Sequence, residues 1–141
     1  MSCTCKKSKI MVVDDNYYNK HAVSIMIKQT CKKGAITAEN GQLGFEAYQK
    51  NFVQTCCNTK IEMIIMDLQM PIMDGYKSTE NILAYYENMS TDPRYSHIKK
   101  PSIFGMTSIV LPKYSWITER CKQVGMKGML FKPVAKKGLV Q

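Results

Sequence analysis

Short apolar runs alternate with longer amphipathic stretches along the chain. The run at residues 61–66 contains consecutive apolar positions, which is typical of a strand covered on both faces of a sheet. The runs predict strands at residues 10–13, 35–38, 61–66, 102–106 and 128–131. The amphipathic stretches predict helices at residues 17–31, 41–52 and 76–88, and a fourth helix that begins near Pro112 and ends at Gly125. Residues 89–100 are polar and contain Pro93, so we expect a long loop there.

The spacing of apolar residues predicts which helix positions face the core. We expect Leu43, Ala47 and Phe45 to face inward from the second helix. In the fourth helix, Ile117, Cys121 and Val124 keep the spacing of an inward face. Cys31 also occupies a core-like helix position, where a free cysteine behaves as a small hydrophobe. We therefore interpret these two cysteines as structural thiols and not as metal ligands.

The alternation of strands and helices favours an α/β fold with a parallel sheet and crossover helices. Five strand–helix units in this order suit a flavodoxin-like, doubly wound sheet with strand order 2-1-3-4-5 and helices on both faces. At 141 residues, the chain has the size of one domain. We assign residues 1–8 to a basic N-terminal tail and residues 9–141 to the domain. Residues 134–141 are few for a final helix, which is either short or truncated.

Functional side chains follow four of the five predicted strands. Asp14 and Asp15 come directly after the first strand and Asp67 after the third, while Thr107 and Lys132 end the fourth and fifth. Open α/β sheets bind ligands at the carboxyl ends of their strands, so we expect these side chains to converge at one rim. Three carboxylates in one place need a bound cation or a shared proton. Hard oxygen ligands with room for water suit Mg²⁺ or Mn²⁺ better than zinc.

The same residue types indicate phosphoryl chemistry. Asp67 is the candidate nucleophile and would carry the phosphoryl group as an acyl phosphate. Lys132 offers a point charge for one phosphate oxygen, and the Thr107 hydroxyl can donate to another. Transfer of this kind rests mostly on positioning and charge neutralisation. Asp74, beside Gly75 in a turn, is instead expected to cap the helix that follows.

Composition narrows the class of protein. With 45% hydrophobic and 22% charged residues, the chain is typical of a soluble globular domain. No apolar stretch reaches the roughly 18 residues needed to span a bilayer, and the first residues lack the apolar core of a signal peptide, so we expect a cytoplasmic domain without membrane contact. The net charge is +9, but the basic residues are spread along the chain without a recognition-helix or zinc-finger pattern, so nucleic-acid binding is not expected.

The motifs around the rim resemble those of two-component response-regulator receiver domains, which are CheY-like. The resemblance rests on Ile-Met-Val-Val-Asp-Asp-Asn at residues 10–16 and Met-Asp-Leu-Gln-Met-Pro-Ile-Met-Asp-Gly at residues 66–75. Thr107 at a strand end, Gly125-Met, and Phe-Lys-Pro at residues 131–133 complete it. The ordered set covers almost the whole chain, residues 9–134.

The resemblance implies a phosphoacceptor and a metal site. Asp67 would accept a phosphoryl group from a phosphohistidine on a histidine kinase or histidine phosphotransfer protein. Asp14 and Asp15 would hold Mg²⁺, helped by Asp67 and the backbone carbonyl of Gln69.

The resemblance also implies a switch. Thr107 and Lys132 would sense and hold the phosphoryl group, and the face formed by the fourth helix, fifth strand and fifth helix would then change its affinity for a downstream effector. The domain would not be an enzyme towards outside substrates, because its chemistry acts on its own Asp67. It would work as a standalone relay or as the cytoplasmic receiver of a hybrid histidine kinase. The family's switch aromatic aligns with Met129, a departure from the family pattern.

Three other classes of protein share part of this pattern. A haloacid-dehalogenase-like phosphatase also uses an aspartyl nucleophile, but it needs a second acid two residues on, where this chain has Gln69. A flavodoxin-like FMN module needs a phosphate cradle after the first strand, where Asp14 and Asp15 would repel the anion. A basic nucleic-acid-binding domain is the third, and a salt-dependent gel-shift titration would test it.

Overall fold

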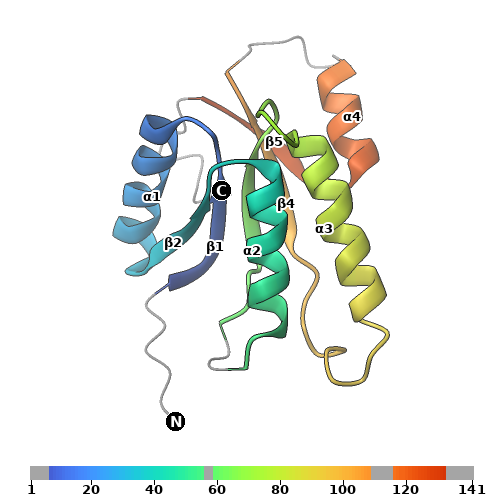
Figure 1. Ribbon diagram of the computed structural model, residues 1–141. Coiled ribbons are helices and arrows are strands. Elements are labelled where there is room, and N and C mark those ends of the chain that lie inside the picture. The colour runs from blue at the N-terminus through green and yellow to red at the C-terminus, as the bar shows by residue number, and fades with distance from the viewer. Residues whose placement is uncertain (1–6, 56–58, 109–115, 133–141) are drawn as a thin grey trace.

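The computed structural model describes residues 7–55, 59–108 and 116–132 of the chain. Within these ranges, five parallel strands form one sheet in the order β2-β1-β3-β4-β5 (Figure 1). The strands are β1 (Lys7–Val13), β2 (Gly34–Ala38), β3 (Met63–Asp67), β4 (Ser102–Thr107) and β5 (Gly128–Phe131). The helices are α1 (Tyr17–Cys31), α2 (Gly41–Val53), α3 (Gly75–Met89) and α4 (Trp116–Val124). The predicted flavodoxin-like α/β fold and its strand order are confirmed.

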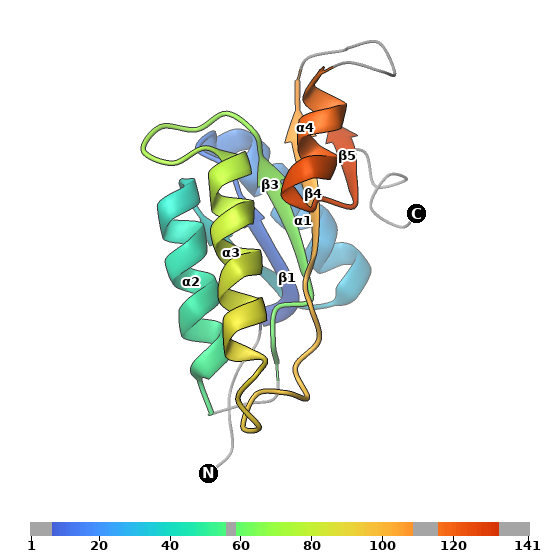
Figure 2. The same ribbon diagram turned by 90° about the vertical axis from the view of Figure 1, so that its right-hand side faces the viewer.

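Helices cover both faces of the sheet. α1 lies on one face, and α2, α3 and α4 lie on the other (Figure 2). Because successive side chains of a strand point to opposite faces, β1 contributes to two separate cores. Val12 packs in a cluster with Val23 and Ile27 of α1, whereas Met11 and Val13 belong to the larger cluster on the other face.

Side-chain caps define where three helices begin. Asn16 accepts a hydrogen bond from the Asn19 amide at the start of α1, and Asn40 caps α2 in the same way. Asp74 accepts from the Lys77 amide at 2.8 Å and so begins α3. These caps satisfy backbone N–H groups that the first helical turn leaves without partners. The prediction that Asp74 is a helix cap is confirmed.

The predicted inward face of α2 is partly wrong. Leu43 is 44% exposed, while Gly44, Tyr48 and Phe52 are buried. A Cβ on Gly44 would lie 2.9 Å from a Val13 methyl group, so α2 rests on β1 at this glycine. The spacing of apolar residues fits more than one face of α2. The face that contains Gly44 packs on the sheet, because a residue without a side chain lets the helix approach closely.

The two helix cysteines differ in burial. Cys121 and Ile117 of α4 are buried, as predicted. Cys31 is exposed, so the prediction that it belongs to the core is wrong. It is the last residue of α1, where the helix has already passed the buried Ile27 and turns away through Lys32, which has a positive φ of 64°.

Several predicted features fall on the ends and one connection of the chain. Residues 1–6, 109–115 and 133–141, which include most of the N-terminal tail, Pro112 and the final-helix stretch, lie outside the described residues. β1 begins at Lys7, within the residues assigned to the tail. Among the described helices, none combines the length and apolarity that crossing a bilayer requires.

Candidate functional site

The carboxyl ends of β1 and β3 lie side by side and each carries an acid. Val13 of β1 pairs with Met66 of β3, so Asp14 and Asp67 follow at the same level of the sheet. The Asp14 side chain has no exposed surface and Asp67 is only 4% exposed, whereas Asp15 is exposed. The parallel ladder therefore brings together two buried carboxylates from residues that are far apart in the sequence.

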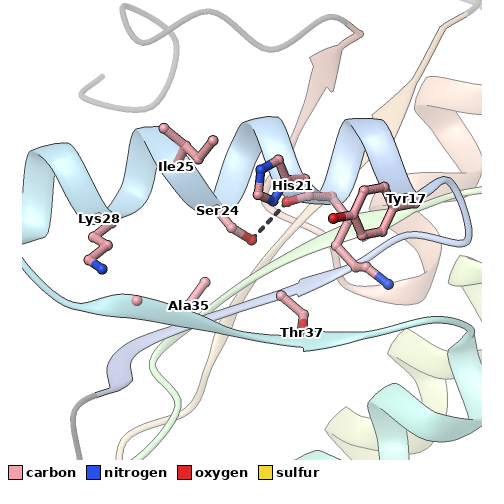
Figure 3. Close-up of a pocket in the computed structure, with 9 residues that line it drawn as sticks. Tyr17, His21, Ser24, Ile25, Lys28, Ala35 and Thr37 are labelled. Atoms are coloured by element: carbon pink, nitrogen blue, oxygen red, sulfur yellow. Dashed lines mark hydrogen bonds between the residues drawn. The ribbon is translucent and has the colours of Figure 1, made fainter.

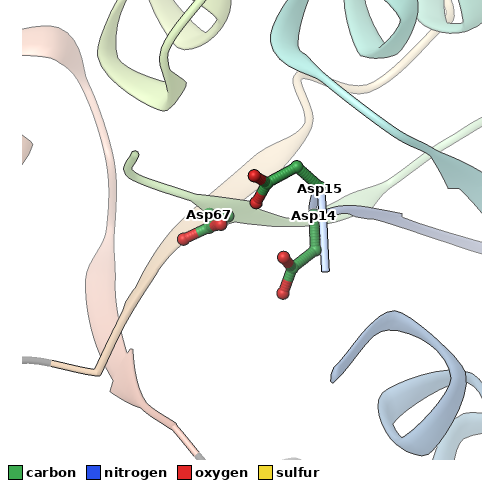
Figure 4. Close-up of side chains that lie close together, drawn as sticks. All are labelled: Asp14, Asp15 and Asp67. Carbon is green, nitrogen blue, oxygen red and sulfur yellow. The ribbon is translucent and has the colours of Figure 1, made fainter. Parts of the chain in front are cut away.

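Asp14, Asp15 and Asp67 form a compact acidic cluster. One carboxylate oxygen from each lies within 4.8 Å of the others, and Figure 4 shows the three side chains at the ends of the two strands. Like charges at this separation repel one another strongly in a buried setting. The structure thus brings together the three acids that the sequence placed at one rim, and the cluster fits a metal site.

Lys132 directs its ammonium group into this cluster. Its Nζ lies 3.2 Å from Asp67 Oδ1 and 3.4 Å from Asp14 Oδ2. The Lys132 amide donates to the Thr107 carbonyl at 2.8 Å, which ties the residue after β5 to the end of β4. Lys132 therefore stands where a point charge can reach both buried acids.

The two oxygens of Asp14 have different environments. Oδ1 accepts a hydrogen bond from the Asn16 amide at 2.9 Å. Oδ2 is buried and, among the described residues, has no hydrogen-bond partner, although the Lys132 ammonium lies 3.4 Å away as an ion pair. Buried carboxylate oxygens are normally satisfied by a donor or a cation. An incompletely satisfied oxygen that belongs to a triad of acids fits a hard divalent cation.

Burial and charge together disfavour the ionised form of Asp67. Desolvation and, after it, the nearby Asp14 carboxylate raise the pKa of the Asp67 carboxyl, the Lys132 ammonium lowers it, and the net result is a pKa of about 7. Perturbed acids of this kind gather at functional sites, because reactive groups are tuned by their surroundings.

Thr107 and Gln69, the remaining predicted site residues, lie near the same rim. Thr107 ends β4, is buried, and pairs with Phe131 in the sheet. The Asp67 backbone lies opposite Met106 in the same ladder, so the Thr107 position is one step further along the rim. Gln69 is exposed in the connection after β3. The role of its backbone carbonyl as a metal ligand stays a prediction.

A glycine lets the connection after β3 fold back onto the strand end. The Gly75 amide donates to the Leu68 carbonyl at 3.1 Å, and a Cβ on Gly75 would overlap the backbone carbonyl oxygen of Asp67. Only a residue without a side chain allows this close approach. The Asp-Gly pair at positions 74 and 75 therefore starts α3 directly against the backbone of the candidate phosphoacceptor.

A second set of contacts holds the connection after β3 in place, and it was not predicted from the sequence. The Gly41 amide donates to the Met73 carbonyl at 3.1 Å, and the Ser78 hydroxyl donates to the Gly41 carbonyl at 2.8 Å. A Cβ on Gly41 would overlap the Met73 carbonyl oxygen. The start of α2 thus holds the connection after β3 in place. In the sequence, only the Asn-Gly pair at positions 40 and 41 pointed to a close contact at this place.

An open depression lies beside the acids. It has a volume of about 510 Å³ and is lined by Asp15, Asn16, Asn19, Ser108 and Lys132. Asn16 and Asn19, which form the hydrogen bond that caps α1, were not predicted as site residues. The depression gives an incoming group a route to the exposed side of the cluster, past Asp15.

Comparisons with known proteins identify relatives of the sequence. No family model matches the chain. The hybrid signal transduction histidine kinase F of Dictyostelium discoideum is 27% identical over 128 residues, and the osmosensing histidine protein kinase SLN1 of Saccharomyces cerevisiae is 31% identical over 131 residues. Each alignment covers 91% of this chain but only 10% and 9% of the relative's own length. The chain is therefore similar to a small part of each kinase.

Solved structures with a similar fold are receiver domains. The receiver domain of the histidine kinase CKI1 from Arabidopsis thaliana, complexed with Mg²⁺ and BeF₃⁻, has a TM-score of 0.74 at 21% identity and covers 96% of this chain and 86% of that chain. The receiver domain of Saccharomyces cerevisiae Ssk1, solved with the histidine phosphotransfer protein Ypd1, has a TM-score of 0.68 at 18% identity, covering 96% and 85%. This chain has the CheY-like receiver fold. The resemblance to two-component and phosphorelay receiver domains is confirmed.

Met129 is the position at which this chain departs from the sequence pattern of receiver domains. In β5, Met129 pairs with Gly105 of β4 and is half-buried against the larger core cluster. Methionine is flexible and unbranched, so it fills the space without the rigid ring that the receiver pattern has at this position.

Proposed function

We propose that the chain is a phosphoaccepting receiver domain of a two-component or phosphorelay system. In this proposal, Asp67 takes a phosphoryl group from a phosphohistidine of a histidine kinase or histidine phosphotransfer protein. The observation that carries the proposal is the position of the Asp67 carboxylate, which lies among two other acids and one lysine at the rim of a receiver fold. The similarity to histidine kinases, and the Ssk1 receiver solved with Ypd1, support a partner of this class.

The transfer would form one bond and break another. An Asp67 carboxylate oxygen attacks the phosphorus atom, and the new O–P bond forms as the P–N bond to the imidazole breaks. The imidazole leaves with the bonding electrons and takes up a proton. Lys132, 3.2 Å from Asp67 Oδ1, would then neutralise charge on a phosphoryl oxygen, and the Thr107 hydroxyl would donate to another.

The acidic cluster is proposed to hold a divalent cation. Asp14, Asp15 and Asp67, with the backbone carbonyl of Gln69, would bind Mg²⁺ or Mn²⁺. When bound, such an ion offsets the negative charge of the carboxylates and of the incoming phosphoryl oxygens. Asp14 Oδ2, which has no hydrogen bond among the described residues, is the oxygen best placed as a ligand.

The chemistry is proposed to be confined to the chain itself. Asp67 would gain and lose one phosphoryl group, and no outside substrate would be turned over. The phosphorylated form would change the affinity for a downstream partner. The domain would act in the cytoplasm, either alone or as the receiver of a hybrid histidine kinase, the class of its relatives.

Intact-mass analysis tests the proposal. The chain is incubated with acetyl phosphate and Mg²⁺, and the expected result is the addition of one phosphoryl group. Asp67→Asn should abolish the adduct. Asp74→Asn is the matched control, because asparagine caps a helix as well as aspartate does, so α3 and the adduct should both be retained.

Two outcomes would count against the proposal. An adduct that persists in Asp67→Asn would place the chemistry on another residue. Absence of any adduct, with acetyl phosphate and with phosphorylated Ypd1 as donors, would reject a phosphoaccepting role. Turnover of a generic phosphate ester would instead favour the phosphatase class.

A further inference from the structure

β2 forms one edge of the sheet, and no other described strand pairs with its outer side. The Asp14 amide donates to the Ala38 carbonyl, so the backbone groups of Ala38 face β1. Backbone groups of successive residues in a strand point to opposite sides. The N–H and C=O groups of Ala35 and Thr37 therefore point away from the sheet. Ala35 is only 4% exposed, so the accessible outward donor and acceptor are those of Thr37.

β2 contains no charged residue and no proline, two features that commonly block pairing of an edge strand with another strand. Edge strands are normally protected by charged side chains, proline, bulges or a covering element. β2 reads Gly-Ala-Ile-Thr-Ala, without charge or proline. The register irregularity of this ladder lies between Lys7 and Met11 on the β1 side. Thr37 is exposed, so the outer edge is accessible at this residue.

α1 runs alongside β2 and forms an open groove with it. The groove has a volume of about 390 Å³, and the side chains of Ala35 and Thr37 rise from β2 towards α1 (Figure 3). The residues that α1 contributes to the groove are Tyr17, Lys20, His21, Ser24, Ile25 and Lys28. A strand added to the edge of β2 would therefore have every second side chain under the flank of α1.

The charge of this groove is positive. Lys20 has a side chain that is only 12% exposed, and Lys28 lines the groove about two helical turns further along α1. The only acid paired with them among the described residues is the exposed Glu39, 3.9 Å from the Lys20 ammonium. Lys32 and Lys33 are exposed directly before β2 and add to the positive charge.

We infer that the β2 edge and the adjoining α1 groove bind an extended acidic segment of a partner protein by β-augmentation. The segment would pair its main chain with the exposed Thr37. Its acidic side chains would alternate with small or apolar ones so that the acids face Lys20 and Lys28. A second copy of this chain suits the edge poorly, because the net charge of +9 would bring two basic edges together. This site does not include Asp67.

A titration with a synthetic peptide tests the inference. The probe is an end-blocked peptide of alternating Glu and Val, as long as the five residues of β2, and the control probe alternates Lys and Val. The amide NMR shift of Thr37 should change with the acidic probe, the hydrogen exchange of this amide should slow, and added salt should weaken the effect. No shift, shifts elsewhere, or equal binding of the basic probe would overturn the inference.

Substitutions separate main-chain pairing from charge. Thr37→Pro removes the outward N–H, a change that an edge strand tolerates, and should weaken binding about five- to tenfold. Thr37→Val keeps the N–H and should bind as the unchanged chain does. Lys28→Glu should also weaken binding, whereas Lys122→Glu on α4 should not. Unchanged binding by Thr37→Pro would overturn the inference, and if that variant fails to fold, the Lys28→Glu result and the amide shifts decide.

The outcome is independent of the phosphoacceptor role. Thr37→Pro should still take up a phosphoryl group from acetyl phosphate at Asp67. Retained phosphorylation with lost peptide binding supports both proposals. Peptide binding without phosphorylation of any variant would support the edge site alone.

Discussion

The ammonium of Lys132 lies 3.2 Å from Asp67 Oδ1 and, at the same time, 3.4 Å from Asp14 Oδ2. One cation is therefore shared by two buried carboxylates, and the exposed Asp15 adds a third negative charge nearby. A single lysine cannot balance this set. The rim consequently keeps a local excess of negative charge, which a divalent ion would offset.

Removing the shared cation should destabilise the metal-free protein. Lys132→Met leaves Asp14 and Asp67 without their partner, and loss of one member of a buried ion pair typically costs about 3 kcal/mol. Urea unfolding in the presence of a chelator measures the free energy of unfolding. Lys122→Met, which changes an exposed lysine of α4, is the control and should have little effect. Equal losses in the two variants would show that the Lys132 contacts contribute nothing specific.

Magnesium should stabilise the folded state. An ion that binds only the native protein adds about 2.7 kcal/mol to the free energy of unfolding at a hundred times its dissociation constant. Melting curves recorded with increasing Mg²⁺, at constant ionic strength set with NaCl, provide the measurement. Asp14→Asn should lose most of the response, because it removes a buried member of the acidic cluster. A melting temperature that Mg²⁺ does not change would argue against the metal site.

Stability without metal should fall as the pH rises from about 4 to about 7. Burial raises the pKa of Asp67 from 3.8 to about 7, so in this window the native state holds a proton that the unfolded state has released. The free energy of unfolding therefore decreases with rising pH, by about 1.4 kcal/mol for each pKa unit, and levels off above pH 7.

Urea unfolding of the wild type and of Asp67→Asn across this range, with a chelator present, isolates the contribution of Asp67. The difference in stability between the two proteins should shift in favour of the asparagine variant as the pH rises. A difference that is constant from pH 4 to pH 8 would contradict the raised pKa.

Gly75 should not tolerate a side chain. Gly75→Ala would place a methyl group against the Asp67 backbone carbonyl, and backbone overlap of this kind should cost about 1–3 kcal/mol and shift the connection after β3. Gly34→Ala is the matched control, because a Cβ there meets nothing within 4 Å. Comparable stability of the two variants in urea would show that the close approach at Gly75 is not required.

Much of the fold could be predicted from local patterns. The bounds of α1 and β5 agree with the predicted ranges, those of α2 differ by one residue at one end, and those of α3 differ by one residue at each end. Polar residues that interrupt the apolar pattern, such as Asn16 and Asp74, also cap the helices. Local chemistry therefore decided both where these helices form and where they begin.

Other features could not be read from the pattern. Leu43 and Cys31 follow helical spacing yet are exposed. Leu43 is exposed because α2 contacts Val13 through Gly44, and Cys31 because it is the last residue of α1. The contact between Gly41 and Met73 joins the start of α2 to the connection after β3, which is distant in the sequence. Such contacts depend on how separate elements pack, and periodicity carries no information about them.

The sequence by itself determined that Asp14, Asp15, Asp67, Thr107 and Lys132 belong to one rim, because the carboxyl ends of parallel strands meet at the same edge of any such sheet. Only the tertiary structure decided that two of these acids are buried, that they share one ammonium group, and that one Asp14 oxygen has no hydrogen bond within the described part of the chain. The physical reason is that the positions where strands begin and end follow from local patterns of polarity, whereas distances and burial arise from the packing of strands and helices against one another.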